Sequence, residues 1–108
     1  MVIDLPPVLD SYFRAASADD IGGIVAHFAP TARVRDEGEW LEGPEQIERW
    51  ARDTRARYRF TATPLSAQPD GGAWIVTARV EGTFPGSPIE LRYRFELDER
   101  LITRLEIA

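Results

Sequence analysis

The stretch 89–97 alternates strictly between apolar and charged side chains. Its apolar positions are Ile89, Leu91, Tyr93, Phe95 and Leu97, and the residues between them are Glu90, Arg92, Arg94 and Glu96. Successive side chains of a strand point to opposite faces, so this pattern predicts a strand with one buried face and one charged face. The sheet that contains it must be covered on one face by other elements of the chain.

The second half of the chain reads as further strands separated by turns. Asp70-Gly71-Gly72 and Pro85-Gly86 are strong turn signals, and Asp98-Glu99 is a weaker one. Between these turns we predict strands at 57–66, 73–82, 89–97 and 101–107.

The first half is predicted to be mainly helical. A helix over 6–16, capped by Asp4, has its apolar side chains at helical spacing. A second helix, capped by Asp19 or Asp20, runs to residue 28 and ends before Pro30. A strand at 31–36, a short return strand at 40–41 and a helix opening at 43–45 follow. The order α-α-β-β-α-β-β-β-β predicts an α+β fold in one domain, 1–108.

Composition excludes several function classes. The 108 residues contain no cysteine and one histidine, His27, so neither a thiolate nucleophile nor a zinc-thiolate or histidine-rich metal site is possible. We predict no cofactor and no metal. The net charge of −5 disfavours a nucleic-acid partner. No apolar run is long enough for a membrane span, and residues 1–4 lack the features of a signal peptide, so we expect a cytoplasmic protein without a membrane partner.

Several short segments together resemble the SnoaL-like branch of the NTF2-like superfamily. They are Tyr12-Phe13, Asp20-Ile21, His27-Phe28-Ala29-Pro30, Val34-Arg35-Asp36, Gly43-Pro44-Glu45-Gln46-Ile47 and Leu91-Arg92-Tyr93-Arg94-Phe95, followed by 102–107. The resemblance covers nearly the whole chain. It implies a cone of three helices on a curved, mainly antiparallel sheet that encloses a pocket for an apolar small molecule.

The similarity to ketosteroid isomerases within this superfamily implies roles for individual residues. The oxyanion-hole tyrosine of those enzymes falls on Tyr12, and their catalytic aspartate falls on Asp36. Their second oxyanion-hole group, a protonated aspartic acid, falls on Leu91, so this acid is missing here. The neighbouring Glu90 belongs to the opposite face of the strand. Epoxide hydrolases of this fold use two aspartates bridged by an arginine, and only one inward aspartate is found here.

Asp36 and Tyr12 are the candidate catalytic residues. Asp36 shares a strand face with Ala32 and Val34, where loss of water raises the pKa of a carboxyl group and makes it a candidate base. A hydrogen bond from the Tyr12 hydroxyl would limit that rise. The alternatives stay open: Asp36 as a solvated strand end or turn cap, and Tyr12 as a core tyrosine.

Apolar and aromatic side chains of the core are the candidate ligand-binding residues, because a curved sheet cannot fill its own interior completely. We assign this role to Trp50, Trp74, Leu91, Tyr93 and Phe95. His27 is expected to interact with the end of the second helix. The acidic run 36–39 is not expected to bind metal, because its side chains alternate between faces.

The charged outer stripe of 89–97, with Arg79 and Glu81 beside it, predicts cross-strand ion pairs and a homodimer joined through this face. Two functions remain open. One is an isomerase, cyclase or dehydratase that uses Asp36 as base and Tyr12 as hydrogen-bond donor on an apolar carbonyl compound. The other is a non-catalytic ligand-binding or scaffold domain. The missing acid at Leu91 favours this second function, or an enzyme of another type.

Overall fold

The computed structural model describes residues 4–108, and it confirms the predicted α+β order of elements. Residues 1–3, which entered the expectation about a signal peptide, lie outside the described part. The elements are α1 (Pro7–Ser17), α2 (Ile21–Ala26), β1 (Phe28–Asp36), β2 (Glu39–Glu42), α3 (Gly43–Tyr58), β3 (Thr61–Asp70), β4 (Ala73–Glu81), β5 (Ile89–Asp98) and β6 (Leu101–Ile107).

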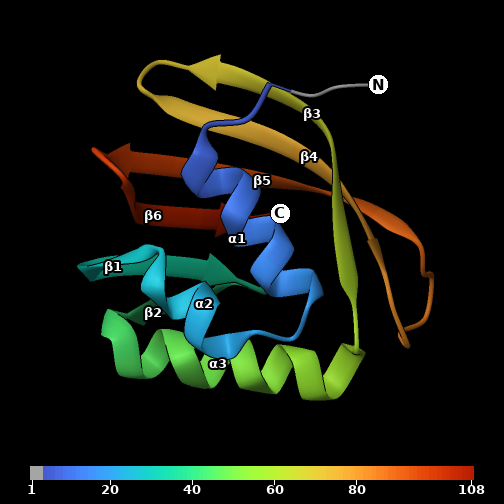
Figure 1. Cartoon of the computed structure of the whole chain (residues 1–108). Helices are drawn as coiled ribbons and strands as arrows, with labels where there is room; N and C mark the ends of the chain where they lie inside the picture. Colours follow the sequence, from blue (N-terminus) through green and yellow to red (C-terminus); the bar gives the residue numbers. More distant parts are fainter. Residues whose placement is uncertain (1–3) are drawn as a thin grey trace.

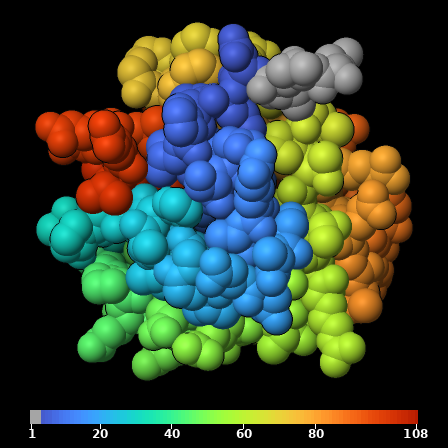
Figure 2. Space-filling model, in the orientation of Figure 1, coloured from blue at the N-terminus to red at the C-terminus, as the bar shows by residue number. Residues whose placement is uncertain are grey.

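All the strands form one curved sheet in the order β2-β1-β6-β5-β4-β3. Neighbouring strands are antiparallel except β1 and β6, which run parallel. The helices lie on one face of this sheet: α3 runs along the β1–β2 edge, and α1 crosses the middle (Figure 1). In Figure 2 the side chains of α1 and α2 form a continuous cover over the centre of that face. Within residues 4–108, no helix combines the length and apolar character needed to cross a membrane.

The core lies between these helices and the inward face of the sheet. The alternation predicted for the strands is correct here: Ala32 and Val34 of β1 are buried and Arg33 and Arg35 are exposed. The largest fully buried side chains come from both layers, and they are Leu9, Val34, Ile47, Val76, Phe95, Ile102 and Leu105.

Of the two predicted helix caps, the one for α1 is wrong and the one for α2 is confirmed. Asp4 does not cap α1, whose N-cap is Pro6 and has no side-chain hydrogen bond. Asp20, rather than Asp19, caps α2, and its carboxylate accepts a 3.0 Å hydrogen bond from the Gly23 amide. Asp19 instead pairs with Arg55 of α3 at 3.2 Å. Both acidic residues therefore hold the α1–α2 connection, one through a cap and one through an ion pair.

Several predicted boundaries were wrong, including the end of the strand predicted at 57–66, which continues to Asp70. The second helix ends at Ala26, with His27 at its C-cap, and the following strand already begins at Phe28 because the amide of Ile102 pairs with the His27 carbonyl. α3 continues to Tyr58, so residues 57 and 58 are helical and the strand predicted from 57 starts at Thr61. Polar and apolar residues alternate from 57 to 62, which is the pattern of a strand and explains the early start that we predicted. In the structure the helix ends at Tyr58, because Arg59 adopts a left-handed backbone conformation (φ 44°).

The outward face carries a network of ion pairs that differs from the predicted one. Arg94 of β5 contacts Glu96 at 3.0 Å, and Arg104 of β6 lies 3.4 Å from Glu106 and 3.5 Å from Glu96. Arg79 pairs with Glu81 of its own strand rather than across strands, because their side chains are two residues apart on the same face. The outer surface of β5 and β6 is therefore charged but largely paired within the chain.

Candidate functional site

A cavity of about 550 Å³ opens between α1, α3 and the inward face of the sheet. Six aromatic side chains contribute to its wall, and they are Tyr12, Trp50, Tyr58, Phe60, Phe84 and Tyr93. The β4–β5 connection and the ends of β5 and β6 complete it with aliphatic side chains. The charged side chains on this wall are Asp36 and Glu37, which are adjacent in the sequence. The cavity is thus apolar with a local negative charge, a composition that suits a small apolar ligand with one polar end.

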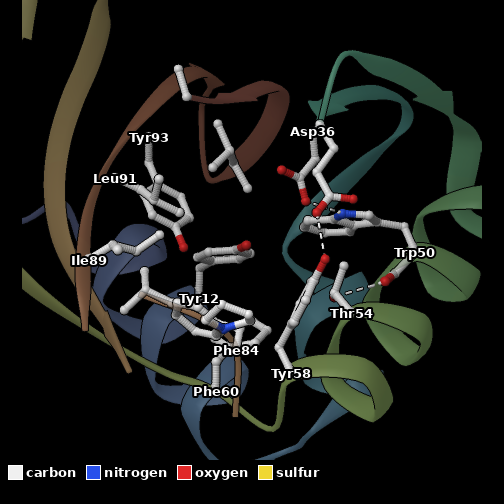
Figure 3. A pocket seen from close by; sticks show the side chains of 15 residues that line it. Tyr12, Asp36, Trp50, Thr54, Tyr58, Phe60, Phe84, Ile89, Leu91 and Tyr93 are labelled. Carbon is white, nitrogen blue, oxygen red and sulfur yellow. Dashed lines mark hydrogen bonds between the residues drawn. The ribbon is translucent and has the colours of Figure 1, made fainter. Parts of the chain in front are cut away.

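Asp36 is the last residue of β1, and its carboxylate faces the cavity as the strand parity predicts. The indole Nε1 of Trp50 donates a 2.9 Å hydrogen bond to Asp36 Oδ2 (Figure 3). Burial raises the pKa of the Asp36 carboxyl group, and the neighbouring charge of Glu37 adds to the rise. The hydrogen bonds from Trp50 and from the Glu37 backbone oppose it, because they stabilise the charged carboxylate.

Glu37 also lines the cavity, although strict alternation would send its side chain to the opposite face. The alternation argument fails at this residue because Glu37 has left β1: its φ of 52° and the φ of 80° at Gly38 belong to a tight turn. The Glu37 carboxylate accepts a 2.7 Å hydrogen bond from the Tyr58 hydroxyl and lies 3.5 Å from the guanidinium of Arg57. Two adjacent carboxylates therefore reach the same cavity, each with its own donor from α3.

Tyr12 of α1 and Tyr93 of β5 face the cavity from the other side, and Figure 3 shows both hydroxyl oxygens directed into it. Only 3% of Tyr12 and 4% of Tyr93 are exposed. Burial raises the pKa of both hydroxyl groups, and the charge of Asp36 contributes to each rise, so both stay protonated at neutral pH. The expected hydrogen bond from Tyr12 to Asp36 is not formed, because Trp50 is the side chain that reaches the carboxylate.

The structure brings together most of the predicted site residues, but not all. Tyr12, Asp36, Trp50, Leu91 and Tyr93 line one cavity. Leu91 contributes an aliphatic wall, and no acidic side chain of β4 or β5 takes its place in the lining.

Trp74 and Phe95 lie elsewhere. They face each other on β4 and β5, farther along the sheet than the cavity. Phe95 is fully buried and packs edge-on against the Tyr12 ring, with 5.5 Å between the ring centroids. It therefore supports a cavity residue instead of lining the cavity.

Several lining residues were missed by sequence reasoning, above all Glu37, Tyr58 and Phe84. Gly38 directly after Glu37 was the available signal, since a glycine in a turn often follows a residue whose direction no longer obeys strand parity. Tyr58 lies one helical turn beyond Thr54, which also lines the cavity, so both belong to the same face of α3. Phe84 packs edge-on against Tyr58 with 5.8 Å between ring centroids, a contact between distant segments that no local pattern indicates.

This arrangement can move a proton on a bound carbonyl compound. A carboxylate with a raised pKa can take a proton from a carbon acid, and protonated tyrosine hydroxyls can stabilise the negative charge that forms on the carbonyl oxygen. The surrounding apolar wall lowers the local dielectric constant, which strengthens both effects. Within residues 4–108 no group of three histidine, aspartate or glutamate side chains is placed to hold a metal ion.

Comparison with known proteins gives one family and a common fold. Residues 9–105 match the family model described as SnoaL-like domain. A solved structure from Sinorhizobium meliloti, provisionally named a polyketide cyclase, is 40% identical to this chain, with a TM-score of 0.93 over 97% of this chain and 96% of that one. None of the curated proteins compared with the chain matches it.

Two more distant structures share the fold. A protein of ketosteroid isomerase-like fold from Catenulispora acidiphila, in complex with trimethylamine, is 20% identical, with a TM-score of 0.85 over 97% of this chain and 86% of that one. An epoxide hydrolase/cyclase-like enzyme of pyran ring formation in salinomycin is 22% identical, with a TM-score of 0.79 over 93% and 85%.

Proposed function

Because this chain belongs to the SnoaL-like domain family, we propose that it is an enzyme that transfers a proton next to the carbonyl group of a small apolar compound. Asp36 is the base and Tyr12 donates a hydrogen bond to the carbonyl oxygen. The outcome is an isomerisation, cyclisation or dehydration. The similar Sinorhizobium meliloti protein named as a polyketide cyclase supports this reaction class.

One observation carries the proposal: Asp36 is a carboxylate on an apolar cavity wall whose pKa is raised by burial, and Trp50 holds it in place. A base works best when its pKa lies near the working pH, so a raised pKa improves the match. Trp50 fixes the orientation through Oδ2, which leaves the other carboxylate oxygen, Oδ1, to accept the proton.

The experiment uses 2-tetralone, a small bicyclic ketone whose protons between the aromatic ring and the carbonyl are acidic. Replacement of these protons by deuterium in D₂O is followed by NMR with and without the protein. We expect the wild-type protein to accelerate exchange above the buffer rate and Asp36→Asn to return it to that rate. Equal rates with wild type, with Asp36→Asn and with buffer would remove the proposal.

A non-catalytic ligand-binding or scaffold domain is the second candidate, and the leucine at position 91 favours it, because the paired acid of ketosteroid isomerases is absent there. Mass spectrometry of ligands that copurify with the protein separates the candidates when it is combined with the exchange assay. A tightly retained ligand and no acceleration of exchange would favour binding alone.

We also propose that the chain forms a homodimer through the outer face of β5 and β6. Arginine and glutamate side chains occur together there. On the same sheet Trp40 of β2, which β1 separates from β6, is 39% exposed, with the guanidinium groups of Arg33 and Arg104 at 4.7 and 4.9 Å from its ring centroid. A face with both charge signs can pair with a second copy of itself. Sedimentation at micromolar concentration tests this, and a monomer there would remove the dimer.

A further inference from the structure

The hydroxyl groups of Tyr12 and Tyr93 have no partner in the described chain. Both side chains are more than nine-tenths buried, and both hydroxyl oxygens point into the cavity (Figure 3). The side-chain hydrogen bonds found within residues 4–108 include the third tyrosine, Tyr58, but neither of these two. The rings are buried while the hydroxyl oxygens are accessible from the cavity, because within residues 4–108 neither oxygen is among the enclosed polar atoms that lack a partner, so both hydroxyls are free to donate to a group that enters.

An aromatic cluster beneath the cavity holds the two rings in place. Phe13 packs edge-on against both, with centroid distances of 5.3 Å to Tyr12 and 5.0 Å to Tyr93. Phe95 also contacts both, at 5.5 Å from Tyr12 and 6.1 Å from Tyr93. Because the same two phenylalanines contact both tyrosines, the positions of the hydroxyls are set before any ligand enters. Donors fixed in this way lose little free energy to reorganisation when charge develops on a bound oxygen.

Tyr93 also explains how this site can function with a leucine at position 91. The two residues share the inward face of β5, because they are two positions apart on a strand. The long side chain of Tyr93 brings a protonated hydroxyl to the cavity, where the aliphatic Leu91 offers no donor. The same strand therefore supplies a neutral hydrogen-bond donor two residues later.

We propose that Tyr12 and Tyr93 donate hydrogen bonds to the same acceptor oxygen of the ligand, forming a paired donor site opposite the carboxylate of Asp36. A carbonyl oxygen has two lone pairs and accepts both hydrogen bonds. The ligand is accordingly an apolar molecule with a ketone or enolate oxygen at the tyrosine end and an acidic carbon toward Asp36. This deepens the proposed function and rests on it for the identity of the reaction, but the binding of the oxygen does not depend on catalysis.

The carbonyl stretch of bound 2-tetralone, labelled with ¹³C at the carbonyl carbon, tests the pair by infrared spectroscopy. Each hydrogen bond lowers the stretching frequency. We expect Tyr12→Phe and Tyr93→Phe each to raise the frequency and the double variant to raise it furthest. Tyr58→Phe is the matched control, because its hydroxyl lines the same cavity but is bonded to Glu37, and it should leave the band unchanged.

Affinity and stability give independent readouts. Each of the two substitutions should weaken 2-tetralone binding about fivefold, the equivalent of one ordinary hydrogen bond, and should leave binding of the hydrocarbon tetralin unchanged. Neither should lower the thermal midpoint of the ligand-free protein, since the hydroxyl that is removed has no protein partner. A strongly destabilised Tyr93→Phe would mean that its hydroxyl has a structural partner, and the paired site would be wrong.

The infrared and exchange results separate this inference from the proposed function. A lowered carbonyl band that both tyrosines control, without any acceleration of exchange, would keep the donor pair and remove the catalytic role of Asp36. Exchange that depends on Asp36, with a carbonyl band that Tyr93→Phe does not move, would keep the enzyme and overturn the donor pair. If both hold, Tyr93→Phe should slow exchange by about 10²-fold, the usual effect of removing one oxyanion donor.

Discussion

The indole N–H of Trp50 donates a 2.9 Å hydrogen bond to the carboxylate of Asp36, which joins the middle of α3 to the end of β1 inside the cavity. This bond opposes the effect of burial on the pKa of Asp36. The pKa of the carboxyl group therefore reflects two opposing sets of effects: burial and the charge of Glu37 raise it, and the hydrogen bonds from Trp50 and from the Glu37 backbone lower it.

Replacement of Trp50 by phenylalanine removes the donor and keeps an aromatic ring in the cavity wall. We expect the pKa of Asp36 to rise further, because burial and the charge of Glu37 still raise it while the Trp50 hydrogen bond that lowers it is gone. Carboxyl ¹³C chemical shifts of Asp36 recorded against pH report this directly. A pKa equal to that of the wild type would show that the hydrogen bond is not maintained in solution.

Replacement of Glu37 by glutamine should have the opposite effect on the same group. The substitution keeps the shape of the side chain and its ability to bond Tyr58, but removes the negative charge that raises the pKa of Asp36. The titration midpoint of Asp36 should move down. Glu45→Gln is a suitable control, because Glu45 is an exposed residue of α3 that does not line the cavity. A midpoint that moves equally in both variants would point to net charge rather than to the contact.

Asp36→Asn should leave the protein equally or more stable at neutral pH. The folded-state pKa of Asp36 is raised, so protonated Asp36 favours the folded state below about pH 4, and this contribution is lost as the pH rises through the folded-state pKa. At pH 7 the charged carboxylate is a cost that asparagine removes, while its amide oxygen can still accept from Trp50. The thermal midpoint of the variant, relative to that of the wild type, should rise as the pH increases from 4 to 7. A large loss at pH 7 would identify Asp36 as a structural residue.

Leu91→Asp places a carboxyl group on the aliphatic wall of the cavity. We expect a loss of about 1–3 kcal/mol at pH 7, smaller than for a fully buried leucine because Leu91 is only partly buried. The loss should shrink toward pH 4, where the new acid becomes neutral, and Leu91→Asn should show no such pH dependence. If the midpoint of Leu91→Asp equals that of the wild type at both pH values, Leu91 does not face an apolar cavity.

Sequence periodicity was sufficient to place the residues whose direction depends on local backbone alone. Strand parity with Ala32 and Val34 assigned Asp36 to the inward face, and helical spacing did the same for Tyr12. These assignments hold because the elements are regular at those positions. The inward direction of Glu37 was not predicted, because Glu37 follows the end of β1 and has a left-handed backbone conformation, so its side chain does not continue the alternation of the strand.

Tertiary packing determines which of the inward-facing residues line the cavity. Leu91, Tyr93 and Phe95 share one face of β5, yet the first two line the cavity and Phe95 lies beneath α1. The alternation of side chains along the strand does not distinguish these positions, since whether a residue lines the cavity depends on where a helix crosses the strand. The same holds for Trp50 and Asp36, which are 14 residues apart and meet only because α3 packs against β1.

The pH dependence of 2-tetralone proton exchange tests the central claim, that Asp36 is a base in an apolar cavity, most directly. The rate should rise with pH through an inflection equal to the NMR pKa of Asp36, and this inflection should move to lower pH in Glu37→Gln. Asp36→Asn should show no inflection and only the buffer rate. An inflection that does not follow the Asp36 pKa, or a rate that survives in Asp36→Asn, would contradict the account.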